Sequence, residues 1–143
     1  ADVISDFQNI YRLYQENSVS EILMVHSISY LRLWEAIDFF KECHYLLKEG
    51  GKLILEFPDI EKCASVIVKS KNDYPNYIEA VRSFYAFDMG QIKNRDSFYT
   101  YRFGWSTWNI EKELKSVGFK NIICTEGLLH NQNWRDSHVE AEK

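Results

Sequence analysis

Apolar residues recur at helical spacing in the first third of the chain, three or four positions apart, as they do on one face of a helix. This stripe consists of Leu33, Ile37, Phe40, His44 and Leu47. We therefore predict a helix over residues 31–47 with His44 in the core. Gly50 and Gly51 follow, and both can adopt the positive φ that ends a helix.

A short apolar run comes directly after the two glycines. Residues 52–57 (KLILEF) are typical of a buried strand, and Pro58 ends it because proline cannot donate a ladder hydrogen bond. Asp59 then lies just outside the carboxyl end of the strand. In open α/β sheets this edge is where ligands bind. Asp59 itself is better explained as a helix N-cap than as a substrate contact.

The rest of the pattern extends this unit into one α/β domain. Residues 21–25 are a predicted buried strand and residues 26–30 its following loop, so residues 21–57 form a right-handed parallel β-α-β unit. Ser106 and Gly118 fit the N-cap and the stop of a later helix. No repeat or linker divides the chain, so we treat residues 1–143 as a single domain. The other predicted elements are an extended segment at 2–7, helices at 60–69 and 72–87, a strand at 119–125 and a last edge strand at 136–143.

Composition narrows the class of partner. The chain of 143 residues is 45% hydrophobic and 15% aromatic, which is enough for one folded core. Its formal net charge of −4 argues against a nucleic-acid or membrane-surface binder, because such proteins need a basic face. We expect a small molecule or another protein as the partner.

The cysteines and the first residues bear on location and completeness. Three cysteines, none in a CxxC pair, predict neither a disulfide framework nor a zinc site. No apolar run approaches the length of a membrane span and no leader opens the sequence, so we expect a cytoplasmic protein. Because Ala1 stands directly before a predicted strand, we expect a fragment truncated at its amino terminus.

Four stretches of the sequence resemble the carboxyl-terminal two thirds of class I, Rossmann-like methyltransferases that depend on S-adenosylmethionine (SAM). The most specific is LLKEGGKLILEFPD at residues 46–59, which is similar to the family's Leu-Lys-Pro-Gly-Gly turn and fifth strand, with Glu49 at the usual proline. The others are ADVISDF at 1–7, EILMVHSISYL at 21–31, and a discontinuous set comprising GQ at 90–91, YRFGWS at 101–106, GF at 118–119 and the ending at 135–143.

The resemblance implies a fold and a cofactor. The fold is a partial Rossmann-like methyltransferase sheet with flanking helices, containing strands 3 to 7 of the seven-stranded order 3-2-1-4-5-7-6. The cofactor is SAM, with Asp6 contacting the adenine amino group and Phe7 beside the adenine ring. The alternative for Asp6 is a simple turn or cap residue.

The chain also departs from the family pattern. Ser29 and Tyr30 stand where the family often has Glu and His, and no G-x-G-x-G loop for the methionine part of SAM occurs anywhere. The acidic residue that holds the ribose is absent as well, so the chain contains half of a cofactor site. Without the family's first two strands, strand 4 becomes an apolar edge, and we expect homo-oligomers or pairing through that edge.

His26 is the predicted catalytic base. It follows strand 4 directly, and an imidazole suits proton transfer near neutral pH. The alternative is a loop histidine satisfied by backbone groups. His130 and His138 do not have the spacing of a helical metal pair, and we predict no metal site.

An aromatic and basic segment follows strand 5, where this family has its acceptor-binding insertions. We predict that it forms a cap over the substrate, although each aromatic residue alone is also explained by packing. The predicted substrate-binding residues are Tyr85, Phe98, Tyr101, Arg102 and Trp105.

Three functions remain open from the sequence. The first is a SAM-dependent methyltransferase, or a fragment of one, that acts on a small hydroxyl- or amine-bearing acceptor such as a sugar. The second is a catalytically inactive methyltransferase-like module that serves in binding or assembly, which Ser29, Tyr30 and the missing glycine loop favour. The third, a nicotinamide-dependent oxidoreductase, fits YRFGWS and the final strand pair less well.

Overall fold

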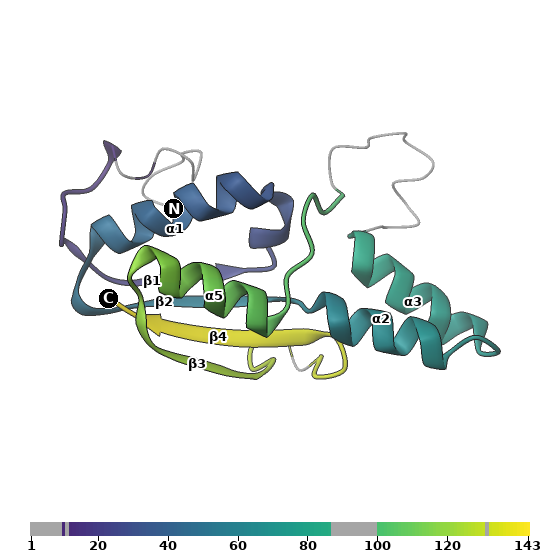
Figure 1. Cartoon of the computed structure of the whole chain (residues 1–143). Coiled ribbons are helices and arrows are strands. Elements are labelled where there is room, and N and C mark those ends of the chain that lie inside the picture. The colour runs from purple at the N-terminus through teal and green to yellow at the C-terminus, as the bar shows by residue number, and fades with distance from the viewer. Residues whose placement is uncertain (1–9, 11, 87–99, 131) are drawn as a thin grey trace.

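The computed structural model contains one mixed four-stranded sheet (Figure 1), and it describes residue 10 and residues 12–86, 100–130 and 132–143. The sheet has the order β1-β2-β4-β3. The first two strands are parallel, whereas β4 is antiparallel to both of its neighbours. The strands are β1 (Val19–Val25), β2 (Leu47–Pro58), β3 (Lys120–Glu126) and β4 (Asp136–Glu142).

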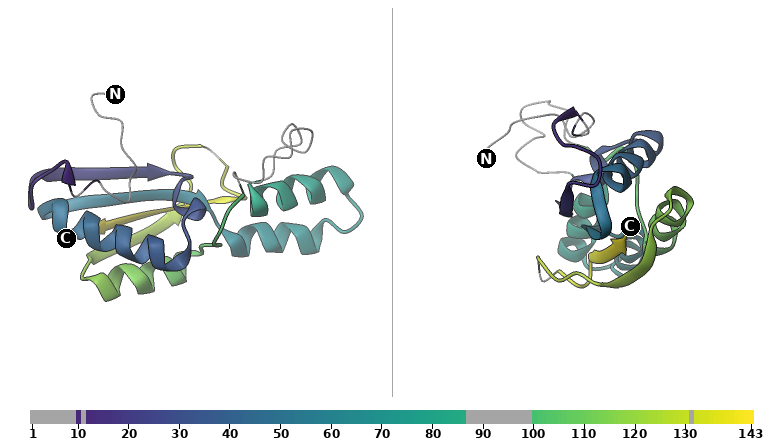
Figure 2. Two further views of the ribbon diagram at one scale, coloured as in Figure 1. Left: turned by 90° about the horizontal axis from the view of Figure 1, so that it is seen from above. Right: turned by 90° about the vertical axis from the view of Figure 1, so that its left-hand side faces the viewer.

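Helices cover one face of the sheet and extend beyond one of its ends. Helices α1 and α5 lie side by side over the same face, while α2 and α3 form a helical hairpin past the carboxyl end of β2 (Figures 1 and 2). A single 3₁₀ turn, η2, follows β1. None of these helices has the length and apolarity needed to cross a bilayer. The bounds are η2 (Ile28–Tyr30), α1 (Leu33–Leu46), α2 (Ile60–Lys69), α3 (Tyr74–Tyr85) and α5 (Thr107–Val117).

The core lies between the sheet and the helix pair α1 and α5. Phe40 of α1 meets Trp105, which precedes α5, edge to face with ring centroids 5.9 Å apart, and both are fully buried. The buried face of α1 is rotated from the predicted stripe by about one residue. That face consists of Ala36, Phe39, Phe40, Cys43 and Leu46. His44 is only half-buried, edge-on against Phe119 with ring centroids 5.2 Å apart, so the prediction of a core histidine is wrong.

The two glycines do not end helix α1, which corrects the prediction. The helix ends at Leu46, and Leu47 is already extended and fully buried as the first residue of β2. The pairing with β1 shifts between Leu47 and Lys52, so residues 48–51 form a bulge within the strand. Gly50 has φ 73°, and a Cβ on Gly51 would lie 2.8 Å from the Lys48 carbonyl oxygen. Burial of Leu46 and Leu47 ends the helix before the glycines are reached. Gly50 and Gly51 are instead needed for the bulge, where the first has a positive φ and the second has no room for a Cβ.

Strand β4 is interior and not an edge strand, which is a second correction. It pairs with β2 on one side and β3 on the other, and most of its residues are buried. The observed order corresponds to 4-5-7-6 of the expected sheet. The segment expected as strand 3, residues 2–7, lies outside the described residues, so the full seven-stranded order stays a prediction.

The helix ends follow the predicted capping chemistry. The carboxylate of Asp59 accepts hydrogen bonds from the backbone N–H groups of Glu61 and Lys62, as expected of an N-cap. Ser106 and Asn109 form a capping box, and Gly118 ends α5 with φ 117°. These residues confirm the predicted starts of α2 and α5.

Candidate functional site

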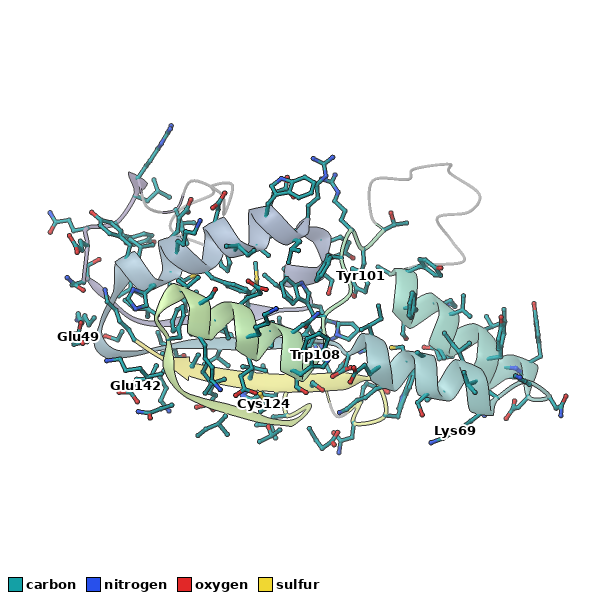
Figure 3. All side chains as sticks on the ribbon, viewed as in Figure 1. Glu49, Lys69, Tyr101, Trp108, Cys124 and Glu142 are labelled. Carbon is teal, nitrogen blue, oxygen red and sulfur yellow. The ribbon has the colours of Figure 1, made fainter. Side chains whose placement is uncertain are left out.

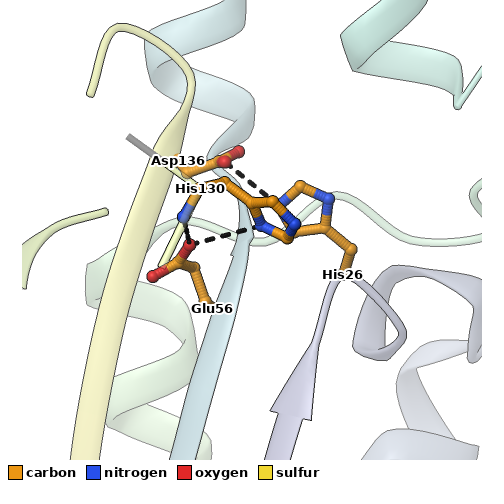
Figure 4. Close-up of side chains that lie close together, drawn as sticks. All are labelled: His26, Glu56, His130 and Asp136. Carbon is orange, nitrogen blue, oxygen red and sulfur yellow. Dashed lines mark hydrogen bonds and ion pairs between the residues drawn. The ribbon is translucent and has the colours of Figure 1, made fainter. Parts of the chain in front are cut away.

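Four side chains that can each bind a proton or a metal ion meet at the carboxyl edge of the parallel strands (Figure 4). His26 follows β1, and Glu56 lies near the end of β2. Asp136 opens β4, which starts at this edge because it runs antiparallel to β2, and His130 belongs to the connection before it. One nitrogen or oxygen atom of each lies within 4.8 Å of those of the others. We call these four residues the His-carboxylate cluster.

The backbone holds His26 in an uncommon conformation. Its φ is 55°, in the left-handed region that few non-glycine residues adopt, and its N–H donates to the Glu56 carbonyl at 2.7 Å. The imidazole Nε2 lies 3.0 Å from Asp136 Oδ2, and the side chain keeps 24% of its surface exposed. The structure therefore retains a strained residue whose ring reaches both solvent and a buried carboxylate.

Asp136 is fully buried and ionised. Arg135 Nε donates to its Oδ1 at 2.6 Å and Arg135 Nη2 to its Oδ2 at 2.9 Å. Burial by itself would raise the pKa of Asp136, but the hydrogen bonds from His26 and Arg135 outweigh burial and lower the pKa to about 2. Because the carboxylate carries no proton near neutral pH, its bond with His26 requires that Nε2 carries one.

Glu56 is a fully buried carboxylate that organises the loop between β3 and β4. It accepts the consecutive backbone N–H groups of Leu128, Leu129 and His130 at 2.8, 2.8 and 2.9 Å. Burial opposes ionisation, yet these three bonds together with His138 lower the pKa of Glu56. Glu56 therefore fixes the backbone that carries His130.

His130 is the solvent-facing member of the cluster. Its Nδ1 lies 3.5 Å from Glu56 Oε1, and its ring centroid is 4.3 Å from that of His26. The side chain is 47% exposed. The cluster therefore meets solvent mainly at this ring.

A tyrosine pair flanks the cluster. Tyr101, labelled in Figure 3, packs edge to face against Tyr30 with ring centroids 4.9 Å apart. The next residue, Arg102, donates its N–H to the Ser29 carbonyl at 2.8 Å, which fixes this segment against the turn after His26. Burial raises the pKa of Tyr101 well above its usual range, with smaller effects from the charges of Arg135 and Asp136.

The predicted substrate-binding residues separate in the structure. Tyr101 lies beside the cluster, and the side chain of the next residue, Arg102, is exposed. Tyr85, at the end of α3, contacts this segment through its backbone carbonyl, which accepts the Tyr101 N–H at 3.1 Å. Trp105 is fully buried between Phe40 and Phe103, so its side chain belongs to the core and we remove it from the predicted cap. The remaining predicted contacts lie outside the described residues, and these are Asp6, Phe7 and Phe98.

The sequence prediction named His26 but missed its neighbours Glu56, His130 and Asp136. One signal for Glu56 was available, since it is the single charged residue within LILEF, an otherwise apolar run in a buried strand. His130 and Asp136 carry no comparable signal, because neither lies within an apolar run: His130 is in a loop, and Asp136 is the first residue of β4.

Comparison with known proteins places the fold. No protein-family model matches the chain, and no curated protein sequence matches it. Solved structures do match. A SAM-dependent methyltransferase from Archaeoglobus fulgidus aligns with TM-score 0.61 and 10% identity over 99% of this chain and 66% of that one.

Two further structures agree with it. A SAM-dependent, possible histamine N-methyltransferase from Thermotoga maritima aligns with TM-score 0.62 and 16% identity, over 99% of this chain and 63% of its own. Human N-acetylserotonin methyltransferase in complex with SAM aligns with TM-score 0.58 and 10% identity, over 99% of this chain and 33% of its own. The chain thus has the α/β fold of class I methyltransferases and spans less than two thirds of each of these three proteins.

Proposed function

We propose that this chain is the carboxyl-terminal, acceptor-side part of a SAM-dependent methyltransferase that acts on a small hydroxyl- or amine-bearing acceptor such as a sugar. The observation that carries the proposal is the position of His26. In a fold shared with SAM-dependent methyltransferases, this imidazole stands at the carboxyl edge of the sheet and is held by an ionised aspartate. That edge is the ligand-binding edge of open α/β sheets.

His26 and Asp136 would act as a proton-accepting pair. With Nε2–H donated to Asp136, Nδ1 is the free acceptor, and it takes the proton that the acceptor oxygen or nitrogen loses as it bonds to the methyl carbon. The negative charge of Asp136 stabilises the imidazolium that forms. When bound, SAM would supply a methyl group on a sulfonium, to be transferred in an in-line displacement that leaves the sulfur as a neutral thioether.

The cofactor side of the site would be completed from elsewhere. The chain has no glycine-rich loop, so we propose that a segment or partner chain outside this sequence binds the methionine part of SAM. Asp6 and Phe7 are the proposed contacts to the adenine. On the acceptor side we propose Tyr85, Phe98, Tyr101 and Arg102.

The edge of the sheet at β1 is proposed as a second contact surface. Within the described residues β1 pairs only with β2, and its Leu23 is 54% exposed. An apolar strand with one free edge favours pairing with a second chain. We propose self-association through this strand.

Two measurements test the proposed function. The first is calorimetric titration of the tag-free polypeptide with SAM and with S-adenosylhomocysteine, run beside an intact-mass check. Binding at micromolar strength would support a completed cofactor site. A folded protein that binds neither compound would contradict a cofactor site formed by this chain alone.

The second measurement follows transfer of a labelled methyl group from SAM to a panel of small sugars and amines, with the chain combined with the segment or partner chain that completes the cofactor side. We expect His26→Gln to lower the rate by roughly 100-fold or more, because a positioned general base contributes about that much. His44→Gln, which changes a histidine on α1 away from the cluster, serves as the matched control. Equal rates for the two variants would contradict the role of His26, and SAM binding without turnover would favour the inactive module.

A further inference from the structure

We propose that the His-carboxylate cluster binds one divalent transition-metal ion. The inference does not rest on methyl transfer, because it concerns only what the four side chains can hold. Two imidazoles and two carboxylates are a mixed nitrogen and oxygen donor set, which suits Mn²⁺, Fe²⁺, Co²⁺ or Zn²⁺ better than the oxygen-preferring Ca²⁺ or Mg²⁺. It departs from the sequence prediction, which contained no metal site.

The distances within the cluster match the edges of a coordination shell. With metal–ligand bonds of about 2.1 Å, neighbouring ligand atoms are about 3.0 Å apart in an octahedron and about 3.4 Å apart in a tetrahedron. His26 Nε2 and Asp136 Oδ2 are 3.0 Å apart, and His130 Nδ1 and Glu56 Oε1 are 3.5 Å apart. The four ligand atoms lie within 4.8 Å of one another, against about 4.2 Å across an octahedron.

The charges of the cluster also favour a cation. Both carboxylates are fully buried, and a carboxylate binds a metal ion in its deprotonated form. Asp136 has Arg135 as a counter-charge. In the described part of the chain, however, no lysine or arginine forms an ion pair with Glu56, whose partners are backbone N–H groups and the imidazoles of His130 and His138. A bound ion would supply the positive charge that this buried carboxylate lacks.

The backbone around the cluster is organised as a second layer behind the ligands. The three N–H groups of residues 128–130 orient Glu56, and the bidentate Arg135 orients Asp136. Outer-layer hydrogen bonds of this kind fix ligand carboxylates in metal sites. Glu56 Oε1 accepts only one of the backbone bonds and retains a lone pair for an ion.

Ion binding and the His26–Asp136 hydrogen bond are alternatives. A His26 ring that binds an ion through Nε2 cannot donate from that atom to Asp136 at the same time. The ion-free form therefore keeps the 3.0 Å bond seen here, and the ion-bound form replaces it with two metal bonds. The solvent-exposed side at His130 leaves room for water or an oxygen-bearing ligand to complete the coordination.

The test uses tag-free protein that has been treated with a chelator and then freed of it. Calorimetric titration with MnCl₂ is the main measurement, since Mn²⁺ avoids the free thiols of Cys43, Cys63 and Cys124. ZnCl₂ is then titrated in competition. We expect one Mn²⁺ per chain, displaced by Zn²⁺ from the same site.

Three variants assign the site. His130→Gln and His26→Gln should each weaken Mn²⁺ binding by at least about tenfold, while His44→Gln should leave it unchanged. Because the His130 side chain is 47% exposed, we expect its variant to fold normally, which circular dichroism checks. No binding at millimolar Mn²⁺, or binding that both cluster variants leave within twofold, would overturn the proposal. Because no SAM is present, this outcome is independent of the tests of methyl transfer.

Discussion

The two ends of the parallel strand pair β1 and β2 are built in different ways. At the amino end of β2, helix α1 runs straight into the strand through the buried residues Leu46 and Leu47. There Lys143 closes the end with neutral partners, its N–H donating to the Gly51 carbonyl at 3.0 Å and its Nζ to Asn17 Oδ1 at 2.7 Å. At the carboxyl end the His-carboxylate cluster brings two buried, ionised carboxylates within reach of two imidazoles.

The difference shows where this fold accepts the energetic cost of buried charge. The amino end buries one ammonium group, that of Lys143, which donates to neutral oxygens, whereas the carboxyl end buries two carboxylates. Burying each of these charges costs free energy unless it is hydrogen-bonded. The loop before β4 supplies those hydrogen bonds through residues 128–130 and Arg135. The carboxyl end differs in that its two buried carboxylates lie beside two imidazoles, which is the arrangement that both proposals concern.

Substitution of Glu56 is expected to have the largest effect on the difference between the two ends of the strand pair. Glu56→Gln keeps one carbonyl oxygen as an acceptor but puts an amide NH2 against at least one of the three backbone N–H groups, so we expect the free energy of unfolding to fall by about 2–4 kcal/mol. Glu49→Gln, an exposed glutamate near the amino end of β2, should change it by less than about 0.5 kcal/mol. Urea denaturation measures both. Similar small effects would mean that the carboxyl end is not held by Glu56.

Acid titration gives a smaller effect that is specific to Asp136. Its pKa is lowered from 3.8 to about 2 in the folded protein, so its stabilising contribution is complete above pH 4 and is lost as the pH falls toward 2. The shift corresponds to roughly 2 kcal/mol. We expect Asp136→Asn to flatten the stability curve between pH 4 and pH 2, measured by denaturation in the presence of a chelator. A curve as steep as that of the unmodified protein would assign the acid sensitivity to other carboxylates.

The smallest effect on stability is expected at the side of the sheet, away from both ends. Leu23→Lys on β1 should change the free energy of unfolding by less than about 0.5 kcal/mol, because the side chain is largely exposed. It should abolish self-association in sedimentation experiments, because a lysine on an edge strand opposes pairing. Ile123→Lys, on β3 at the other edge, is the matched control. A stable monomer before any substitution would contradict the proposed edge pairing.

Much of the fold was accessible from local patterns. Helix α2 has the predicted bounds, and the helices predicted at 31–47 and 72–87 are present with shorter ends. Capping at Asp59, Ser106 and Gly118 was predicted correctly because each cap depends on side chains a few residues away. The end of α1 was predicted incorrectly, because burial of Leu46 and Leu47 against the sheet decided it and not the glycines that follow.

The sequence by itself determined the order of the described helices and strands and the caps at Asp59, Ser106 and Gly118, since these depend on neighbours along the chain. Only the tertiary structure decided that Trp105 belongs to the core and that His26 meets Asp136 across 110 positions. The physical reason is that an antiparallel strand inserted beside β2 brings its first residues to the carboxyl edge. The His-carboxylate cluster is a product of that pairing, and no local spacing of residues encodes it.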